Sequence, residues 1–125
     1  MLEKEDILNF WFTECTPEQW FKKDSEFDKM LEARFAGIVE RALAGKLDSW
    51  ADSDSGCLAL ILLLDQFTRN IFRDTPRAFS GDEKSLELSF LCEENGYLAN
   101  ADIHWCHFIL MPRMHSEDIA VQDVS

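Results

Sequence analysis

The sequence predicts an all-α fold in which antiparallel helical hairpins pack side by side. Apolar residues recur at helical spacing along almost the whole chain, residues that begin and end helices lie between these stretches, and no stretch shows the sustained alternation of a β-strand. A chain of 125 residues, 46% of them hydrophobic, has the size and composition of one domain around one core. We therefore expect residues 1–125 to form a single helical domain.

The first two expected helices are short. Residues 3–12 follow an acidic first turn with apolar residues at helical spacing, namely Ile7, Leu8, Trp11 and Phe12. The sequence TPEQ, which begins at Thr16, has the pattern of a capped helical turn. This turn is expected to direct Trp20 and Phe21 toward the core.

The longest helix is expected to start at residue 24 or 25 and to end at residue 44. Its apolar residues recur every three or four positions, and Gly45 stands where a helix-ending glycine is typical. The stretch 48–56 is rich in Asp, Ser and Gly, which predicts a loop in which Trp50 packs on the core. The cap of the next helix is expected from one of three residues, Ser53, Asp54 or Ser55.

A central helix is expected over residues 57–72. Its first half is apolar on nearly all sides, which predicts burial, and its second half is polar. Two further helices are expected, one from residue 80 or 82 to 95 and one from about 100 to 111. Pro112 is expected to interrupt the chain, and Ser116 is expected to begin a last short helix.

The composition excludes several classes of function. Twelve Lys and Arg against twenty-four Asp and Glu give a formal charge of -12, which repels nucleic-acid phosphates and anionic membrane surfaces. No apolar stretch approaches the roughly 20 residues of a membrane-spanning helix, and the first residues lack the basic segment of a secretory signal. The four cysteines show no close pairing pattern, so reduced thiols are expected. These features favour a cytoplasmic protein without nucleic-acid or membrane partners.

The polar half of the central helix carries the strongest functional signal. Asp65, Arg69 and Arg73 recur every four residues and share one helical face, beside which Gln66 and Asn70 form a second pair. One interpretation is a structural network, in which Asp65 pairs with Arg69 and the two amides satisfy backbone groups at loop ends. The other is a pocket in which the two arginines present their donors to a small anion or carboxylate.

A second polar cluster begins at His115. Ser116 followed by Glu117 and Asp118 has the pattern of a capped helix start, and capping accounts for these three residues. Imidazole groups titrate near neutral pH, so His115 is also a candidate general acid or base, with Glu117 or Asp118 to orient it. No nucleophile motif accompanies this cluster.

Neither a metal nor a cofactor is predicted. His104 and His107 can share one helical face, but no second pair of ligands accompanies them, and both are explained as ordinary surface or core histidines. Four aromatic residues near the N-terminus are explained as core, with an aromatic wall beside a polar pocket as the alternative: Trp11, Phe12, Trp20 and Phe21.

Four segments of the sequence resemble, in the same order, a bacterial family known as domain of unknown function 924. The segments are FWF at 10–12, TPEQWF at 16–21, LALILLLDQFTRNIFRDTPRAF at 58–79 and MPRMHSED at 111–118. The resemblance implies an all-helical fold similar to a tetratricopeptide-repeat superhelix, and it implies no reaction. The marked polar positions of the family fall on Asp65, Gln66, Arg69, Asn70, Arg73, His115, Ser116 and Glu117.

The chain departs from the family pattern in two places. Thr68 stands where the family usually has proline, so a straighter helix is expected there. Members of the family usually continue for several helices beyond the HSED segment, whereas this sequence ends at Ser125. A pocket completed by those helices is therefore expected to be incomplete here.

These observations lead to three hypotheses of function. The first is a binding module whose groove takes a small anionic ligand or an acidic peptide end, with the eight polar residues above as ligands. The second is a hydrolase-type enzyme with His115 as general base and Arg69 as stabiliser of an oxyanion or phosphate. The third is a structural or assembly protein.

A homodimer through the C-terminal helices is also expected. A short last helix needs a surface on which to pack. Without the helices that follow in relatives, apolar residues are expected to remain open to solvent and to favour a two-fold interface. These residues are Trp105, Phe108, Ile109, Ile119, Val121 and Val124.

Overall fold

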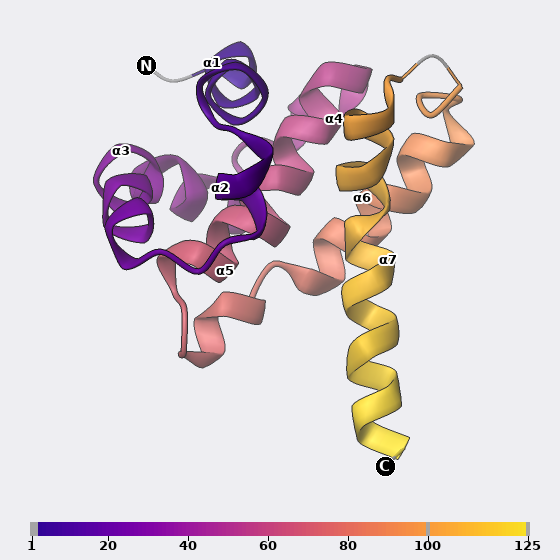
Figure 1. Ribbon diagram of the computed structural model, residues 1–125. Helices are drawn as coiled ribbons and strands as arrows, with labels where there is room; N and C mark the ends of the chain where they lie inside the picture. Colours follow the sequence, from indigo (N-terminus) through magenta and orange to yellow (C-terminus); the bar gives the residue numbers. More distant parts are fainter. Residues whose placement is uncertain (1–2, 100, 125) are drawn as a thin grey trace.

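The protein is helical throughout the described part of the chain (Figure 1). The structure, a computed structural model, describes the backbone of residues 3–99 and 101–124 and the side chains of residues 3–20, 22–99 and 101–116. These segments contain no strand, and none of their helices is long and apolar enough to cross a membrane. The predicted all-α fold is confirmed.

The elements follow one another with short connections. The α-helices are α1 (Lys4–Asn9), α2 (Pro17–Phe21), α3 (Ser25–Leu43), α4 (Asp54–Ile61), α5 (Thr68–Ile71), α6 (Asp82–Glu94) and α7 (Ile103–Val124). Two π-helical segments are η1 (Phe10–Glu14) and η3 (Leu62–Phe67), and two 3-10 turns are η2 (Asp48–Asp52) and η4 (Pro76–Phe79). Because α4, η3 and α5 follow one another without a break, we call residues 54–71 the central helix.

The N-terminal helices form as predicted, with one difference. α1 continues as η1 beyond the expected end at residue 12. At the start of α2, the backbone N–H of Thr16 donates to Oε1 of Gln19 (2.8 Å), as the capped turn requires. Trp20 is buried, and its indole N–H donates to the carbonyl of Trp11 (2.8 Å), which fixes α2 to η1. The side chain of Phe21 lies outside the described residues.

Both ends of α3 lie where the sequence predicts them. Asp24 accepts hydrogen bonds from two backbone N–H groups of the first turn (3.0 and 3.4 Å), and Gly45 adopts a φ of 82°, which costs glycine little. The segment expected as a loop is the turn η2, and Trp50 packs against the core as expected. Ser53 caps the central helix by accepting a hydrogen bond from the N–H of Gly56 (3.1 Å).

The central helix is buried, and α3 and α6 beside it run antiparallel to it. It starts three residues before the predicted residue 57, because Ser53 caps it there. Asp28, near the start of α3, binds Arg73, which lies just beyond the end of the central helix. Cys57, near the start of the central helix, contacts Cys92 near the end of α6. These pairings are those of helical hairpins. Figure 1 shows α7 beside α6, with its C-terminal part extending away from the other helices.

The predicted break at Pro112 is wrong, because α7 runs through it and is longer than α3. Proline removes one helical hydrogen bond. The helix continues because side chains on both sides of the proline are anchored. Phe108 is buried before it, and Arg113 after it donates to the hydroxyl and carbonyl oxygens of Ser89 on α6 (3.1 and 3.2 Å). Ser116 therefore lies within α7 and does not cap a new helix.

The apolar surface expected to drive dimerisation is not open as predicted. Phe108 and Ile109 are each 1% exposed, and Trp105 is half-buried. They are covered because α7 packs on the N-terminal aromatic residues of the same chain, with the ring centroids of Phe108 and Trp11 5.6 Å apart. Three further residues of the expected interface have side chains outside the described residues: Ile119, Val121 and Val124. The homodimer stays a prediction.

Gly56→Ala is expected to lower the free energy of unfolding by about 1–3 kcal/mol, the usual cost of overpacking. An added Cβ would lie 2.0 Å from the carbonyl oxygen of Trp50, and that oxygen belongs to the backbone and cannot turn aside. Gly37 in α3 is the matched control, since nothing lies within 4 Å of its added Cβ. Gly37→Ala is expected to gain up to about 1 kcal/mol of helix propensity. Urea unfolding measures both, and equal effects would contradict the packing described here.

Candidate functional site

A cleft of about 530 Å³ lies between the polar end of the central helix, the connection from α2 to α3, and α7. We call it the basic cleft. Its lining residues are Trp20, Lys22, Lys23, Gln66, Arg69, Asn70, Arg73, His107, Met111, Met114 and His115. Four of these residues carry a permanent positive charge, and none of the described residues that line the cleft is acidic.

The central helix contributes the residues that the sequence singled out. Their spacing of three or four places them on one side of the helix. Asp65 is fully buried and does not line the cleft, but it contacts two residues that do, Arg69 and His115. The structure brings five of the eight predicted ligand residues into one cleft: Gln66, Arg69, Asn70, Arg73 and His115.

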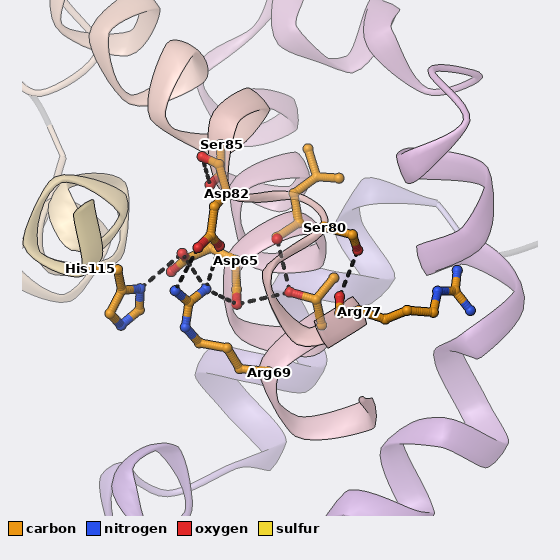
Figure 2. A network of polar contacts seen from close by, with 9 residues as sticks. Asp65, Arg69, Arg77, Ser80, Asp82, Ser85 and His115 are labelled. Atoms are coloured by element: carbon orange, nitrogen blue, oxygen red, sulfur yellow. Dashed lines mark hydrogen bonds and ion pairs between the residues drawn. The ribbon is translucent and has the colours of Figure 1, made fainter. Parts of the chain in front are cut away.

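Asp65 holds two residues of the cleft in place (Figure 2). Its Oδ1 accepts hydrogen bonds from Nη1 of Arg69 (2.9 Å) and from Nδ1 of His115 (2.9 Å). Arg69 also donates to both carboxylate oxygens of Asp82 on α6 (2.8 and 3.1 Å). The predicted pair of Asp65 and Arg69 is therefore confirmed. The network connects the central helix to α6 and α7.

Asp28 on α3 holds the second arginine of the cleft, Arg73, in place. Its carboxylate accepts from Nε and Nη2 of Arg73 (2.7 and 3.3 Å) and from the amide nitrogen of Asn70 (2.9 Å). Hydrogen bonding to Asp28 raises the pKa of Arg73 above its ordinary value, so this residue is a permanent cation. Asn70 thus binds a carboxylate, whereas the network interpretation placed it on backbone groups.

Both arginines retain donors that these carboxylates do not use. A guanidinium has five N–H donors. Arg73 uses Nε and one N–H of Nη2, so Nη1 and the other N–H of Nη2 are not engaged by Asp28. Arg69 leaves Nε and one N–H of Nη2 unused by Asp65 and Asp82. Each arginine is therefore held by its carboxylate and still has donors for a ligand.

Gln66 is buried, with 8% of its surface exposed. Its side chain has no hydrogen-bond partner among the described residues, although it lines the basic cleft. Its amide atoms are not among the buried side-chain atoms without a partner in the described chain, so they are accessible from the cleft. The amide of Gln66 is therefore available to a molecule in the cleft.

α7 supplies the opposite wall of the basic cleft. His107, Met114 and His115 each lie three or four positions from Met111, so the four residues share one side of the helix. The two methionines and Trp20 give this wall an apolar part. The face spans Pro112, so it exists only because α7 is not broken there. Met111 and Met114 were not predicted as site residues, because the sequence predicted a break at Pro112. Lys22 and Lys23 were not predicted because they lie in the connection between α2 and α3.

Two predicted ligand residues are not placed in the cleft. Ser116 lines a separate hollow of about 230 Å³ with Asp82 and Glu83. The side chain of Glu117 lies outside the described residues, as does that of Asp118. The group that orients His115 is Asp65, which is 50 positions away, rather than either neighbour proposed from the sequence.

The other histidines do not form a metal centre with their neighbours. His104 lies against the ring of Trp20, with centroids 5.1 Å apart, and does not line the cleft. Among the described side chains, no group of three or more His, Cys, Asp and Glu lies close enough together to hold a metal ion.

Comparison with known proteins places the chain in a family. The model of a family of bacterial proteins of unknown function, DUF924, matches residues 7–125. The solved structure of a protein of unknown function from Agrobacterium tumefaciens is similar, with 34% sequence identity and a TM-score of 0.86 over 96% of this chain and 68% of that one. The search of curated proteins finds no match. The chain belongs to the DUF924 family.

Proposed function

We propose that the protein binds a small anionic ligand, a carboxylate or a phosphate, in the basic cleft. The observation that carries the proposal is that the amide of Gln66 and unused donors of Arg73 line the same cleft, and that Gln66 has no partner in the described chain. A carboxylate or phosphate has more than one oxygen that can accept hydrogen bonds from these groups. Hydrogen bonds between a cation and an anionic oxygen are about twice as strong as neutral ones.

The charge of the cleft supports an anion rather than a cation. Asp28 balances Arg73, and Asp65 and Asp82 flank Arg69. Lys22 and Lys23 are exposed and have no carboxylate partner in the segments that the structure describes. On a chain of formal charge -12, such a site attracts anions that the rest of the surface repels.

The size of the cleft supports a small molecule. Small-molecule sites usually have volumes of about 300–1,000 Å³ and combine apolar walls with a few polar groups. The basic cleft, at about 530 Å³, has this composition. Trp20, Met111 and Met114 offer contacts for a carbon skeleton, while Gln66 and Arg73 bind the charged end.

Titration calorimetry with sodium succinate and with sodium phosphate, at low salt, tests the proposal. We expect saturable binding of at least one of the two anions, and the comparison identifies the preferred head group. Replacing Lys22 and Lys23 by Gln is expected to weaken binding up to about 30-fold, since exposed charge pairs are each worth up to about 1 kcal/mol. Gln66→Leu, which keeps the volume and removes the amide, is expected to weaken it by a similar factor.

The matched control replaces Lys29 and Lys46 by Gln. This variant changes the net charge by the same amount, at residues that do not line the cleft. It is expected to bind the anion as the parent does, apart from a small long-range effect that salt removes. If both double variants weaken binding equally, or if Gln66→Leu has no effect, the anion does not bind in the basic cleft.

A further inference from the structure

We propose that His115 is a general base in the basic cleft, positioned by Asp65, and that the protein hydrolyses a carboxylic ester that carries a negative charge. The inference rests on the proposed anion site, which would hold the charged end of the substrate. It goes beyond binding because it assigns a reaction and a catalytic residue.

The contact between Asp65 and His115 determines which ring nitrogen carries the proton. An ionised carboxylate only accepts hydrogen bonds, so Nδ1 of His115 is the donor at 2.9 Å. Nε2 then has a free lone pair in the neutral ring. Figure 2 shows this second nitrogen pointing away from Asp65, and His115 lines the cleft. A base oriented in this way by a buried carboxylate is the arrangement of hydrolytic enzymes.

The carboxylate itself is fixed. Asp65 is fully buried, and the Oδ1 that holds His115 also accepts from Arg69, which Asp82 clamps from the other side. The central helix, through Asp65 and Arg69, and α6, through Asp82, thus fix the imidazole that α7 carries. A purely structural salt bridge does not need its histidine to line a cleft, whereas a base must be within reach of its substrate.

The residues around His115 indicate water as the nucleophile. No serine, threonine or cysteine is among the described residues that line the basic cleft. The cleft does contain N–H donors for a developing negative charge, those of Arg69 that Asp65 and Asp82 leave unused. A base and donors, without a nucleophilic hydroxyl or thiol, fit the direct attack of water on an ester carbonyl.

The reaction balances with water as the co-reactant. As the oxygen of water bonds to the carbonyl carbon, Nε2 of His115 takes one of its protons, and the carbonyl oxygen becomes an oxyanion. When this intermediate collapses, the bond from the carbonyl carbon to the alcohol oxygen breaks. His115 returns the proton to the alcohol, and the acid product loses its own proton to solvent.

The test uses 4-nitrophenyl succinate, an anionic ester, and the neutral 4-nitrophenyl acetate. We expect the protein to hydrolyse the anionic ester with saturation kinetics and to prefer it over the neutral one in kcat/KM. His115→Gln is expected to lower kcat for the anionic ester at least about 100-fold, the usual contribution of a general base. KM and the Kd for succinate are expected to stay within about twofold. His104→Gln on the same helix controls for unspecific hydrolysis by exposed histidines.

A second variant separates positioning from folding. Asp65→Asn keeps the size of the side chain but no longer fixes the tautomer of His115, so it is expected to lower kcat and to leave the Kd for succinate nearly unchanged. If succinate binds as proposed but hydrolysis is absent, or persists in His115→Gln, the catalytic inference is overturned and the anion site stands. If succinate and phosphate do not bind, the proposed function itself has failed.

Discussion

Asp65→Ala is expected to lower the free energy of unfolding by about 3 kcal/mol, at the lower end of the cost of breaking a buried ion pair. Asp65 is fully buried, and its Oδ1 is the acceptor for both Arg69 and His115 (2.9 Å each). Its removal leaves the imidazole of His115 without a partner. Arg69 keeps Asp82, which is why the upper end of the range is not expected. Urea unfolding followed by circular dichroism measures the effect.

Two variants control for this prediction. Asp82→Ala removes a partly exposed partner of the same arginine and is expected to cost at most about 1 kcal/mol. Asp65→Asn preserves the shape of the side chain, and its loss in free energy of unfolding is expected to lie between those of Asp82→Ala and Asp65→Ala. An Asp65→Ala protein within about 1 kcal/mol of the parent would show that the network does not hold the three helices together.

Phe67→Ala is expected to have the largest effect on stability, a loss of about 3–5 kcal/mol. Phe67 is completely buried at the end of η3, where the central helix meets the N-terminal aromatic residues. Its ring centroid lies 6.2 Å from that of Phe10, 5.4 Å from Trp11 and 5.3 Å from Phe35. Truncation would leave a cavity among these rings. The rings cannot move into it, because Phe10 also packs against Phe35 on α3, and Trp11 also packs against Trp20 on α2 and Phe108 on α7.

Phe79→Ala is the control for this truncation. Phe79 is 56% exposed and touches Arg69 with its ring, 5.5 Å from the guanidinium carbon. Its removal is expected to cost no more than about 1 kcal/mol. Equal losses from the two substitutions, measured by thermal and urea unfolding, would contradict the central place of Phe67 in the core.

The helices and the polar face of the central helix were predictable from the sequence because both depend on local spacing. Asp24 and Ser53 cap helices by hydrogen bonds to residues a few positions away, and Gly45 ends a helix by its own positive φ. Such local features can be recognised in the sequence. The pair of Asp65 and Arg69 lies within one helical turn and was predictable for the same reason.

The partners between helices were not predictable in this way. Asp28 is 45 positions from Arg73, and Asp65 is 50 positions from His115. Periodicity shows which residues share a face, but it does not show which other helix that face meets. Asp28 in particular follows the start of α3, where an acidic residue is already explained by the helix dipole.

The wall formed by α7 was hidden by Pro112. Local propensity predicts a break at this residue, since proline in a helix interior costs about 3 kcal/mol. The anchoring of Arg113 and His115 on two other helices outweighs this local cost. With a break, Met111 and His115 belong to different helices, and their common face with His107 cannot be inferred.

The most direct measurement of the central claim is anomalous diffraction from crystals soaked in sodium selenate, a tetrahedral anion with a strong signal at the selenium edge. We expect a peak inside the basic cleft, within hydrogen-bond distance of the amide of Gln66 and the unused donors of Arg73. At a limiting selenate concentration the peak is expected to be weaker in crystals of Gln66→Leu than in crystals of the parent. Selenate bound only outside the cleft, or not bound at all at concentrations that saturate the crystal, would contradict the account.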